Sequence, residues 1–164
     1  MPSYTTADIR NVLIAGPSGA GKTALVDALL FESGTVTRKG SVADKSSFSD
    51  FEKEEKEHGH SIYASVLHAN YQGKRINLID TPGSADLMGQ AIQCLPAVET
   101  VAVVINAAAG IDVVARRIMD LARSMDLPRA IIVNRIDAPE VDLAAVLSRI
   151  QESCQQNRFR ILLK

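Results

Sequence analysis

The sequence contains no tryptophan, and aromatic residues make up only 4% of its 164 residues. A core built with so few aromatic rings must be aliphatic, formed from isoleucine, valine, leucine and alanine. Hydrophobic residues at 46% and charged residues at 23% are ordinary values for a globular chain. These values exclude disordered, collagen-like and disulfide-rich classes of protein, and the length fits one domain.

The chain also lacks a charge excess, a cysteine cluster and a long hydrophobic run. A net charge of -1 provides no global field for nucleic acid, so an RNA contact requires a local patch or another domain. Cys94 and Cys154 stand far apart, which predicts free thiols rather than a disulfide or a metal site. The longest interior apolar run, Val101–Ile105, is far below the roughly 20 residues of a membrane span. Without a signal-peptide pattern either, we expect a cytoplasmic protein with no membrane partner.

Short apolar runs alternate with helical patterns along most of the chain. The runs that predict buried strands are Val12–Ala15, Val101–Ile105 and Ala130–Val133. Helical spacing follows at about residues 22–33, 85–95, 114–125 and 141–150. The helix at 114–125 has one apolar face, made of Val114, Ile118, Leu121 and Met125. This alternation predicts an α/β fold with a mostly parallel sheet and helices on both faces.

A hairpin and a long loop interrupt that alternation. Residues 61–69 and 75–80 predict two strands with a short turn between them, hence an antiparallel hairpin at the sheet edge. Ile62, Ala64 and Val66 fall on one face of its first strand. Residues 34–60 show no periodicity, so we expect either a functional loop or disorder. The charge run Glu52–Glu57 inside it predicts a solvated helical turn or loop.

The first chemical motif follows the first buried strand. It reads Gly16-Pro17-Ser18-Gly19-Ala20-Gly21-Lys22-Thr23 and fits the phosphate-loop pattern G-x-x-x-x-G-K-[ST]. Glycines let backbone N–H groups turn inward around phosphate oxygens. Lys22 supplies a positive charge for the β- and γ-phosphates, and the Thr23 hydroxyl can ligate Mg²⁺. A glycine-rich turn with an unrelated lysine is the alternative, but the strand–loop–helix context favours nucleotide binding.

A second motif, Asp80-Thr81-Pro82-Gly83, ends the second hairpin strand. An aspartate at a strand end can hold Mg²⁺ from the side opposite Thr23. Gly83 has no side chain, so its N–H can approach a γ-phosphate closely. Taken alone, the motif is also a good turn sequence.

A third motif, Asn134-Arg135-Ile136-Asp137, follows the last buried strand. The Asp137 carboxylate can accept two hydrogen bonds from guanine that adenine cannot donate, and a site of this kind rejects the wrong base strongly. Asn134 would tie this loop to the phosphate loop, and the Arg135 stem would pack over the base. The alternative is a helix-capping aspartate beside an incidental asparagine.

In their order and spacing, the three motifs resemble the GTP-binding domain of translational GTPases, most closely the divergent elongation-factor-G-like branch. The resemblance covers about residues 4–150, and Glu57–Ile62 is similar to the first switch of that family. It implies a P-loop NTPase fold, GTP or GDP with Mg²⁺, and GTP hydrolysis on the ribosome, with its rRNA and ribosomal proteins. It also implies that Ser61 stands where the family has a metal-binding threonine, so the metal ligands would be Thr23, Ser61 and Asp80.

The sequence departs from the family at several site positions. Ser84 stands where the family has the histidine that positions the attacking water, so unaided hydrolysis should be slow. The candidates to replace that histidine are His58, His60 and Gln90, each of which also reads as an ordinary solvated residue. Gly19 replaces an aspartate common in the family, which puts any extra cation there in doubt. Arg135 for the usual lysine is the mildest change.

The segment after residue 150 departs further. The family would supply a strand and a Ser-Ala pair, and this sequence has no such pair there. We expect Ile161–Leu163 to form an edge strand, the base pocket to lack one wall, and guanine affinity to be weakened. The chain is therefore interpreted as a GTP-binding domain over residues 1–164, truncated from a multidomain protein, and as a monomer.

Three functions remain open from the sequence. The first is a GTPase in which Lys22, Gly83 and Ser84 face the reacting phosphate. The second is a nucleotide-state switch with little hydrolysis of its own, which Ser84 favours. The third is an ATP-using P-loop enzyme, which Asp137 disfavours.

Overall fold

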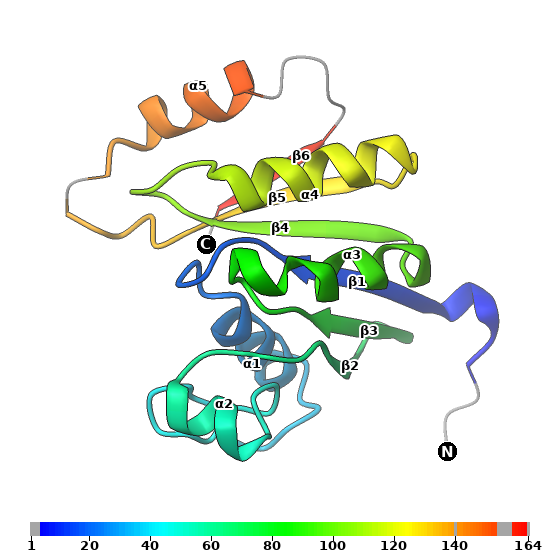
Figure 1. Ribbon diagram of the computed structural model, residues 1–164. Coiled ribbons are helices and arrows are strands. Elements are labelled where there is room, and N and C mark those ends of the chain that lie inside the picture. Colours follow the sequence, from blue (N-terminus) through cyan, green and yellow to red (C-terminus); the bar gives the residue numbers. More distant parts are fainter. Residues whose placement is uncertain (1–3, 140, 154–158, 164) are drawn as a thin grey trace.

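A mixed β-sheet forms the centre of the molecule. The computed structural model describes residues 4–139, 141–153 and 159–163. Within these residues the sheet has six strands in the order β2-β3-β1-β4-β5-β6 (Figure 1). The strands are β1 (Ile9–Ala15), β2 (Ser65–Tyr71), β3 (Lys74–Asp80), β4 (Thr100–Asn106), β5 (Arg129–Asn134) and β6 (Arg160–Leu163). β2 and β3 pair antiparallel and all other neighbours are parallel, which confirms the predicted sheet.

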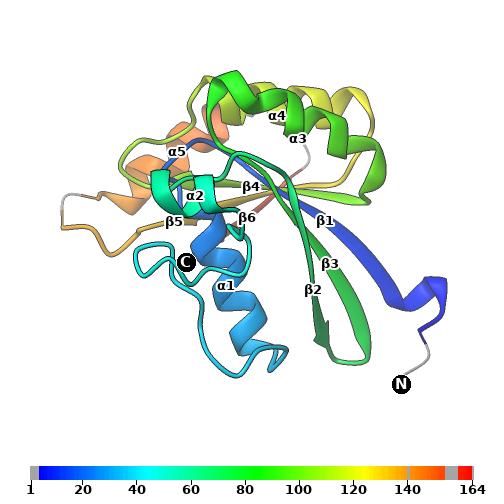
Figure 2. The same ribbon diagram turned by 60° about the horizontal axis from the view of Figure 1, so that its bottom comes forward.

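Helices cover both faces of this sheet, as predicted. α1 (Lys22–Glu32) lies on one face, and α3 (Met88–Cys94) and α4 (Val113–Ser124) lie on the other (Figure 2). α5 (Leu143–Ser153) packs into the same hydrophobic cluster as α3 and α4. The short helical segments are α2 (Lys53–His58), η1 (Thr6–Asp8), η2 (Ala85–Leu87) and η3 (Leu95–Ala97).

The core is aliphatic and has one cluster on each face of the sheet. Successive side chains of a strand point to opposite faces, so a strand buried on both sides contributes to both clusters. In β1, Leu13 joins the cluster under α3 and α4, and Ile14 joins the cluster under α1. In β4, Val103 and Val104 divide in the same way. This explains why the central strands are read in the sequence as continuous apolar runs.

The position of β1 determines where a ligand can bind. β1 pairs with β3 on one side and with β4 on the other. The connection through α1 leads to the β3 side of β1, and the connection through α3 leads to the β4 side. The strand order therefore reverses at the carboxyl end of β1, and ligands of open α/β sheets bind at such a point. The loop that follows β1 is the phosphate-loop motif.

The edge hairpin differs in detail from the prediction. β2 begins at Ser65 rather than at residue 61, because residues 61–64 belong to the preceding loop. Val66 is 71% exposed, and Ser65 and Ala69 are the buried residues of β2, so the apolar side chains that share a face in the sequence do not form a buried face. The turn has left-handed backbone at Gln72 (φ 47°) and Gly73 (φ 73°), as a two-residue hairpin loop requires.

The apolar face expected for α4 is rotated from the buried one. The buried residues are Ala115, Ile118, Met119 and Ala122, an i, i+3, i+4, i+7 stripe. Met125, which was expected on this face, is exposed. Two of the buried residues are alanines, whose small side chains let the helix approach the sheet closely.

The remaining expectations about the chain have mixed outcomes. The predicted edge strand is present as β6, parallel to β5. Cys94 is a free thiol, and burial raises its pKa; Cys154 lies outside the described residues. Among the described helices, none is long and apolar enough to cross a membrane.

Candidate nucleotide-binding site

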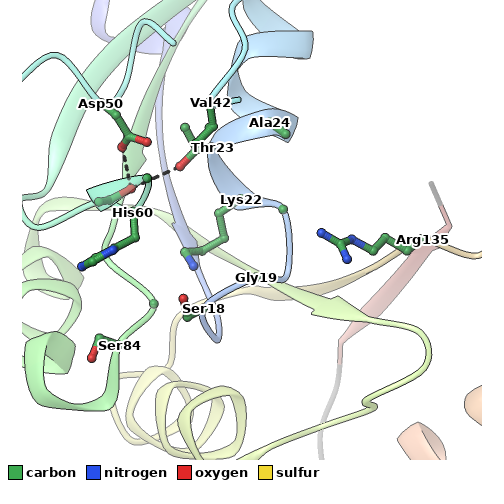
Figure 3. Close-up of a pocket in the computed structure, with 14 residues that line it drawn as sticks. Ser18, Gly19, Lys22, Thr23, Ala24, Val42, Asp50, His60, Ser84 and Arg135 are labelled. Atoms are coloured by element: carbon green, nitrogen blue, oxygen red, sulfur yellow. Dashed lines mark hydrogen bonds between the residues drawn. The ribbon is translucent and has the colours of Figure 1, made fainter. Parts of the chain in front are cut away.

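A cavity of about 260 Å³ opens at the carboxyl end of β1 (Figure 3). The phosphate-loop motif and the start of α1 form one side of it, through Ser18, Gly19, Gly21, Lys22 and Thr23. Four more of the predicted site residues also line it: Ser61, Gly83, Ser84 and Arg135. The structure thus brings parts of all three sequence motifs, and of the first switch, to one cavity.

Lys22 is the cationic group of this cavity. Lys22 is the first residue of α1 and is only 6% exposed. Its Nζ donates a hydrogen bond to the Pro17 carbonyl at 2.9 Å. Burial lowers the pKa of Lys22, although the carboxylates of Asp80, Asp50 and Asp112 act against that shift. A buried ammonium group facing a cavity, next to a helix N-terminus, is suited to bind an anion such as phosphate.

Gly83 lines the cavity close to the Lys22 ammonium group. A Cβ built on Gly83 would collide with the Lys22 ammonium group and would lie 2.5 Å from the Ser18 backbone nitrogen. No other residue type fits there without displacing the phosphate loop. The absence of a side chain therefore keeps the second motif within reach of the phosphate loop.

Asp80 lies under the cavity, at the end of β3. One oxygen, Oδ2, accepts hydrogen bonds from the Thr23 hydroxyl at 2.8 Å and from the Ser49 hydroxyl at 2.6 Å. The other, Oδ1, is buried without a partner among the described residues. Burial raises the pKa of Asp80 to about 6, against the hydrogen bonds from Ser49 and Thr23 and the charge of Lys22. Among the described residues, no contact fully offsets the cost of removing this carboxylate from water.

The oxygens around Asp80 fit a hard divalent cation. Besides the orphaned Oδ1, the hydroxyls of Thr23 and Ser61 lie 3.3 Å apart beside it. Carboxylate and hydroxyl oxygens are the ligands that Mg²⁺ accepts, usually together with phosphate oxygens and water. The donor set that the sequence predicts for Mg²⁺ is therefore gathered in one place.

Asp50 belongs to this group and was missed from the sequence. It is buried, lines the cavity, and its Oδ1 accepts the Ser61 hydroxyl at 2.6 Å. Burial is the main cause that raises the pKa of Asp50. In the sequence it is one acidic residue beside an acidic run, so no local signal distinguishes it.

The first switch is anchored by a second residue that the sequence analysis misjudged. The run Glu52–Glu57 forms α2, and its charges are not all solvated: Glu55 is 1% exposed. Glu55 Oε1 accepts the backbone N–H groups of Ile62 at 2.9 Å and of Tyr63 at 3.1 Å. The carboxylate thereby holds the chain on the far side of Ser61 in place.

The candidates for the missing histidine separate clearly. His60 lines the cavity, whereas His58 and Gln90 are not among its lining residues. Ser84 also borders the cavity, and its hydroxyl points away from Lys22 (Figure 3).

The third motif is joined to the phosphate loop by a direct contact. The Asn134 side-chain amide donates to the Ala20 carbonyl at 2.9 Å, and its Oδ1 accepts the Arg135 backbone N–H at 2.9 Å. This amide passes beside Gly21, whose φ of 89° is left-handed and where a Cβ would collide with it. Asp137 is exposed and does not line the cavity.

The remaining predicted residues lie behind the cavity surface. Gly16, Pro17 and Ala20 are part of the same loop but do not border the cavity, and they shape the backbone of that loop.

An open α/β sheet with a phosphate loop at the point of strand reversal defines the class of P-loop nucleoside-triphosphate-binding proteins.

Comparison with known proteins narrows this class. Residues 7–161 match the family described as the elongation factor Tu GTP binding domain. The chain is 32% identical over 145 residues to the elongation factor G-like protein of Mycobacterium tuberculosis strain CDC 1551, covering 88% of this chain and 20% of that protein. It is 37% identical over 140 residues to the mitochondrial ribosome-releasing factor 2 of Drosophila willistoni, covering 85% and 19% respectively.

A solved structure agrees with these sequence matches. A crystal structure of a protein from Thermus thermophilus superposes with a TM-score of 0.85 at 32% identity, over 90% of this chain and 22% of that one. The chain belongs to the elongation factor Tu GTP-binding domain family, the nucleotide-binding domain of translational GTPases. It spans about a fifth of the length of the curated relatives named above.

Proposed function

We propose that this chain binds GTP with Mg²⁺ and hydrolyses it to GDP and phosphate, as the GTP-binding domain of an elongation-factor-G-like translation factor. The observation that carries this proposal is the Asn134 amide bonded to the Ala20 carbonyl. That contact joins a base-recognition loop to a phosphate loop across Gly21, so both ends of one nucleotide would be held by a single unit.

Each part of the site has a role in this proposal. Lys22 and the phosphate-loop amides hold the β- and γ-phosphates, and Gly83 offers its N–H to the γ-phosphate. Thr23, Ser61 and Asp80 hold Mg²⁺, which supplies neutralisation of the charge that develops on the phosphates. Arg135 packs over the base from the cavity wall, and Asp137 accepts the guanine N–H groups.

Calorimetric titration with GTP, ATP and xanthosine triphosphate, each with Mg²⁺, tests the base contact. We expect wild-type protein to prefer GTP over ATP, and Asp137→Asn to move the preference toward the xanthine nucleotide, because the amide offers a donor where the carboxylate accepts. Asp120→Asn, an exposed change on α4, is the matched control. Equal affinity of wild-type protein for GTP and ATP would contradict guanine recognition.

A second candidate function is a switch that binds GTP but hydrolyses almost none unaided. The observation in its favour is Ser84, a short side chain that points away from Lys22 (Figure 3). Single-turnover phosphate release, measured with and without ribosomes, separates the two. Release only with ribosomes supports a slow GTPase activated by its partner, and release in neither condition favours the switch.

The setting of this activity follows from the same family. We propose that the chain is one domain of a longer cytoplasmic protein that acts as a monomer on the ribosome. Its match to about a fifth of the relatives' length supports the longer protein. Co-sedimentation with ribosomes in the presence of a non-hydrolysable GTP analogue tests the partner.

A further inference from the structure

GTP hydrolysis needs a polar group that holds water beside the γ-phosphate, and few side chains of this cavity are available for that purpose. Thr23 and Ser61 hydrogen-bond each other, and Thr23 also donates to Asp80. Asp50 is occupied by the Ser61 hydroxyl. These groups therefore serve the metal side of the site rather than the water.

His60 and Ser84 line the cavity on the same side of Lys22 (Figure 3). The Ser84 hydroxyl ends one bond from its Cβ and points away from Lys22. The imidazole of His60 also turns away from Lys22 in this view, but it is longer, and it lines the cavity directly before Ser61 in the chain. Of these two side chains, only His60 combines reach with a hydrogen-bonding nitrogen.

The backbone fixes how the His60 ring can act. Its Nδ1 lies 3.2 Å from the His58 carbonyl oxygen. A carbonyl can only accept a hydrogen bond, so Nδ1 donates in this contact, which leaves Nε2 as the ring nitrogen that can face a water. The reversal of the chain that permits the contact is the left-handed Gly59 (φ 70°), which ends α2. The ring is thus set up to meet a water at Nε2.

We propose that His60 is the water-positioning residue of this domain: its Nε2 accepts a hydrogen bond from the attacking water and orients it toward the γ-phosphorus of bound GTP. This inference rests on the proposed function. The water oxygen forms a bond to the γ-phosphorus, and the bond to the β–γ bridging oxygen breaks with its electron pair leaving on GDP. The water proton passes to a γ-phosphate oxygen, so the products are GDP and inorganic phosphate and the imidazole gains no net proton.

Three variants of the whole chain test this role. His60→Ala removes the ring, and His60→Gln keeps a hydrogen-bonding side chain of similar reach. The matched control, His58→Ala, removes a neighbouring imidazole but keeps the backbone carbonyl that orients His60. Each variant is measured for GTP affinity, for single-turnover phosphate release with ribosomes present, and for affinity toward GDP with aluminium fluoride, which mimics the transferring phosphoryl group and requires a placed water.

We expect His60→Ala to lower the hydrolysis rate about 100-fold, the scale at which a misplaced reactant slows a reaction. GTP affinity should change less than about 3-fold, whereas affinity for GDP with aluminium fluoride should fall with the rate, because the water is held only in the transition state. His60→Gln should restore the rate to within about 10-fold of wild type, and His58→Ala should behave as wild type.

Three results overturn the inference. A His60→Ala protein that hydrolyses GTP and binds the mimic as well as His58→Ala does would exclude this role for His60 alone and leave the proposed GTPase intact. Equal loss of GTP affinity and of rate in His60→Ala would instead show that the ring supports only the fold of the switch. Wild-type protein that releases no phosphate even with ribosomes overturns the proposed hydrolysis, and the role of His60 with it.

Discussion

The buried Asp80 carboxylate should destabilise the nucleotide-free protein, and should do so only where it is ionised. Its pKa is raised from 3.8 to about 6, mainly by burial. In the folded state it therefore holds a proton between about pH 4 and pH 6 that the unfolded chain has released. Stability must fall as the pH rises through that window, because the folded state then binds more protons than the unfolded state.

The size of this effect follows from the shift. A displacement of about two pKa units corresponds to about 3 kcal/mol lost well above pH 6, of which about 2 kcal/mol develops between pH 4 and pH 7. Asp80→Asn removes the titrating group, but the side-chain atom that replaces Oδ1 would also be buried without a hydrogen-bond partner. That second penalty, about 1–3 kcal/mol, does not depend on pH.

Urea unfolding of both proteins at pH 4, 5, 6 and 7, with EDTA present and no nucleotide, isolates the titrating part. The unfolding free energy of Asp80→Asn minus that of wild type should increase by about 2 kcal/mol from pH 4 to pH 7. Asp86→Asn, the same charge change at an exposed position nearby, is the matched control. With GTP and Mg²⁺ present at pH 7, wild type should gain more stability than Asp80→Asn, because the variant lacks the carboxylate proposed to hold the metal.

A flat difference between Asp80→Asn and wild type across this pH range would refute the reasoning, because it would mean that the carboxylate is not desolvated. An equal gain of stability from GTP and Mg²⁺ in both proteins would show that Asp80 is not a ligand of the metal.

The other predictions concern packing and the first switch. Gly21→Ala should cost more than Gly34→Ala in urea unfolding, by about 1–3 kcal/mol: both glycines are left-handed, but only at Gly21 does a new Cβ meet another side chain. Glu55→Ala should speed hydrogen exchange at the two backbone amides that its carboxylate accepts, whereas Glu54→Ala, an exposed change on the same helix, should not. Ile118→Ala, at a fully buried position of α4, should lower the unfolding free energy by about 2–5 kcal/mol.

The sequence predicted the parts of the fold that depend on local patterns. Central strands such as β4 are apolar without interruption because both of their faces are covered, and the order of strands and helices follows from them. The face of α4 was misplaced because large side chains such as Met125 were weighted above alanines, although Ala115 and Ala122 are the ones that allow close packing. At β2, the alternation of apolar residues did not indicate the buried face, because Val66 is exposed.

The same distinction holds for the site. Motif residues such as Lys22 and Asn134 could be found because phosphate and base recognition require fixed residue types at fixed spacing. Asp50 and Glu55 could not be found, because their burial arises from tertiary contacts of a long loop. Nothing in an acidic, polar stretch indicates which carboxylate will be desolvated and which will face water. His60 was one of three equal candidates until the cavity separated it from His58.

Direct hydrogen bonds between oxygens of this site link the proposed nucleotide-binding residues to the first switch. Ser49 donates to the same Asp80 oxygen that Thr23 does, and Ser61 bridges Thr23 and Asp50. A cation bound by Thr23, Ser61 and Asp80 would draw on the oxygens that now hold the switch against α1 and β3. Binding or loss of GTP with Mg²⁺ at these residues would therefore redistribute these hydrogen bonds directly, and His60, one residue from Ser61, would move with them. Such an arrangement couples the placement of the attacking water to the state of the switch, so hydrolysis would be fastest when a partner holds the switch closed.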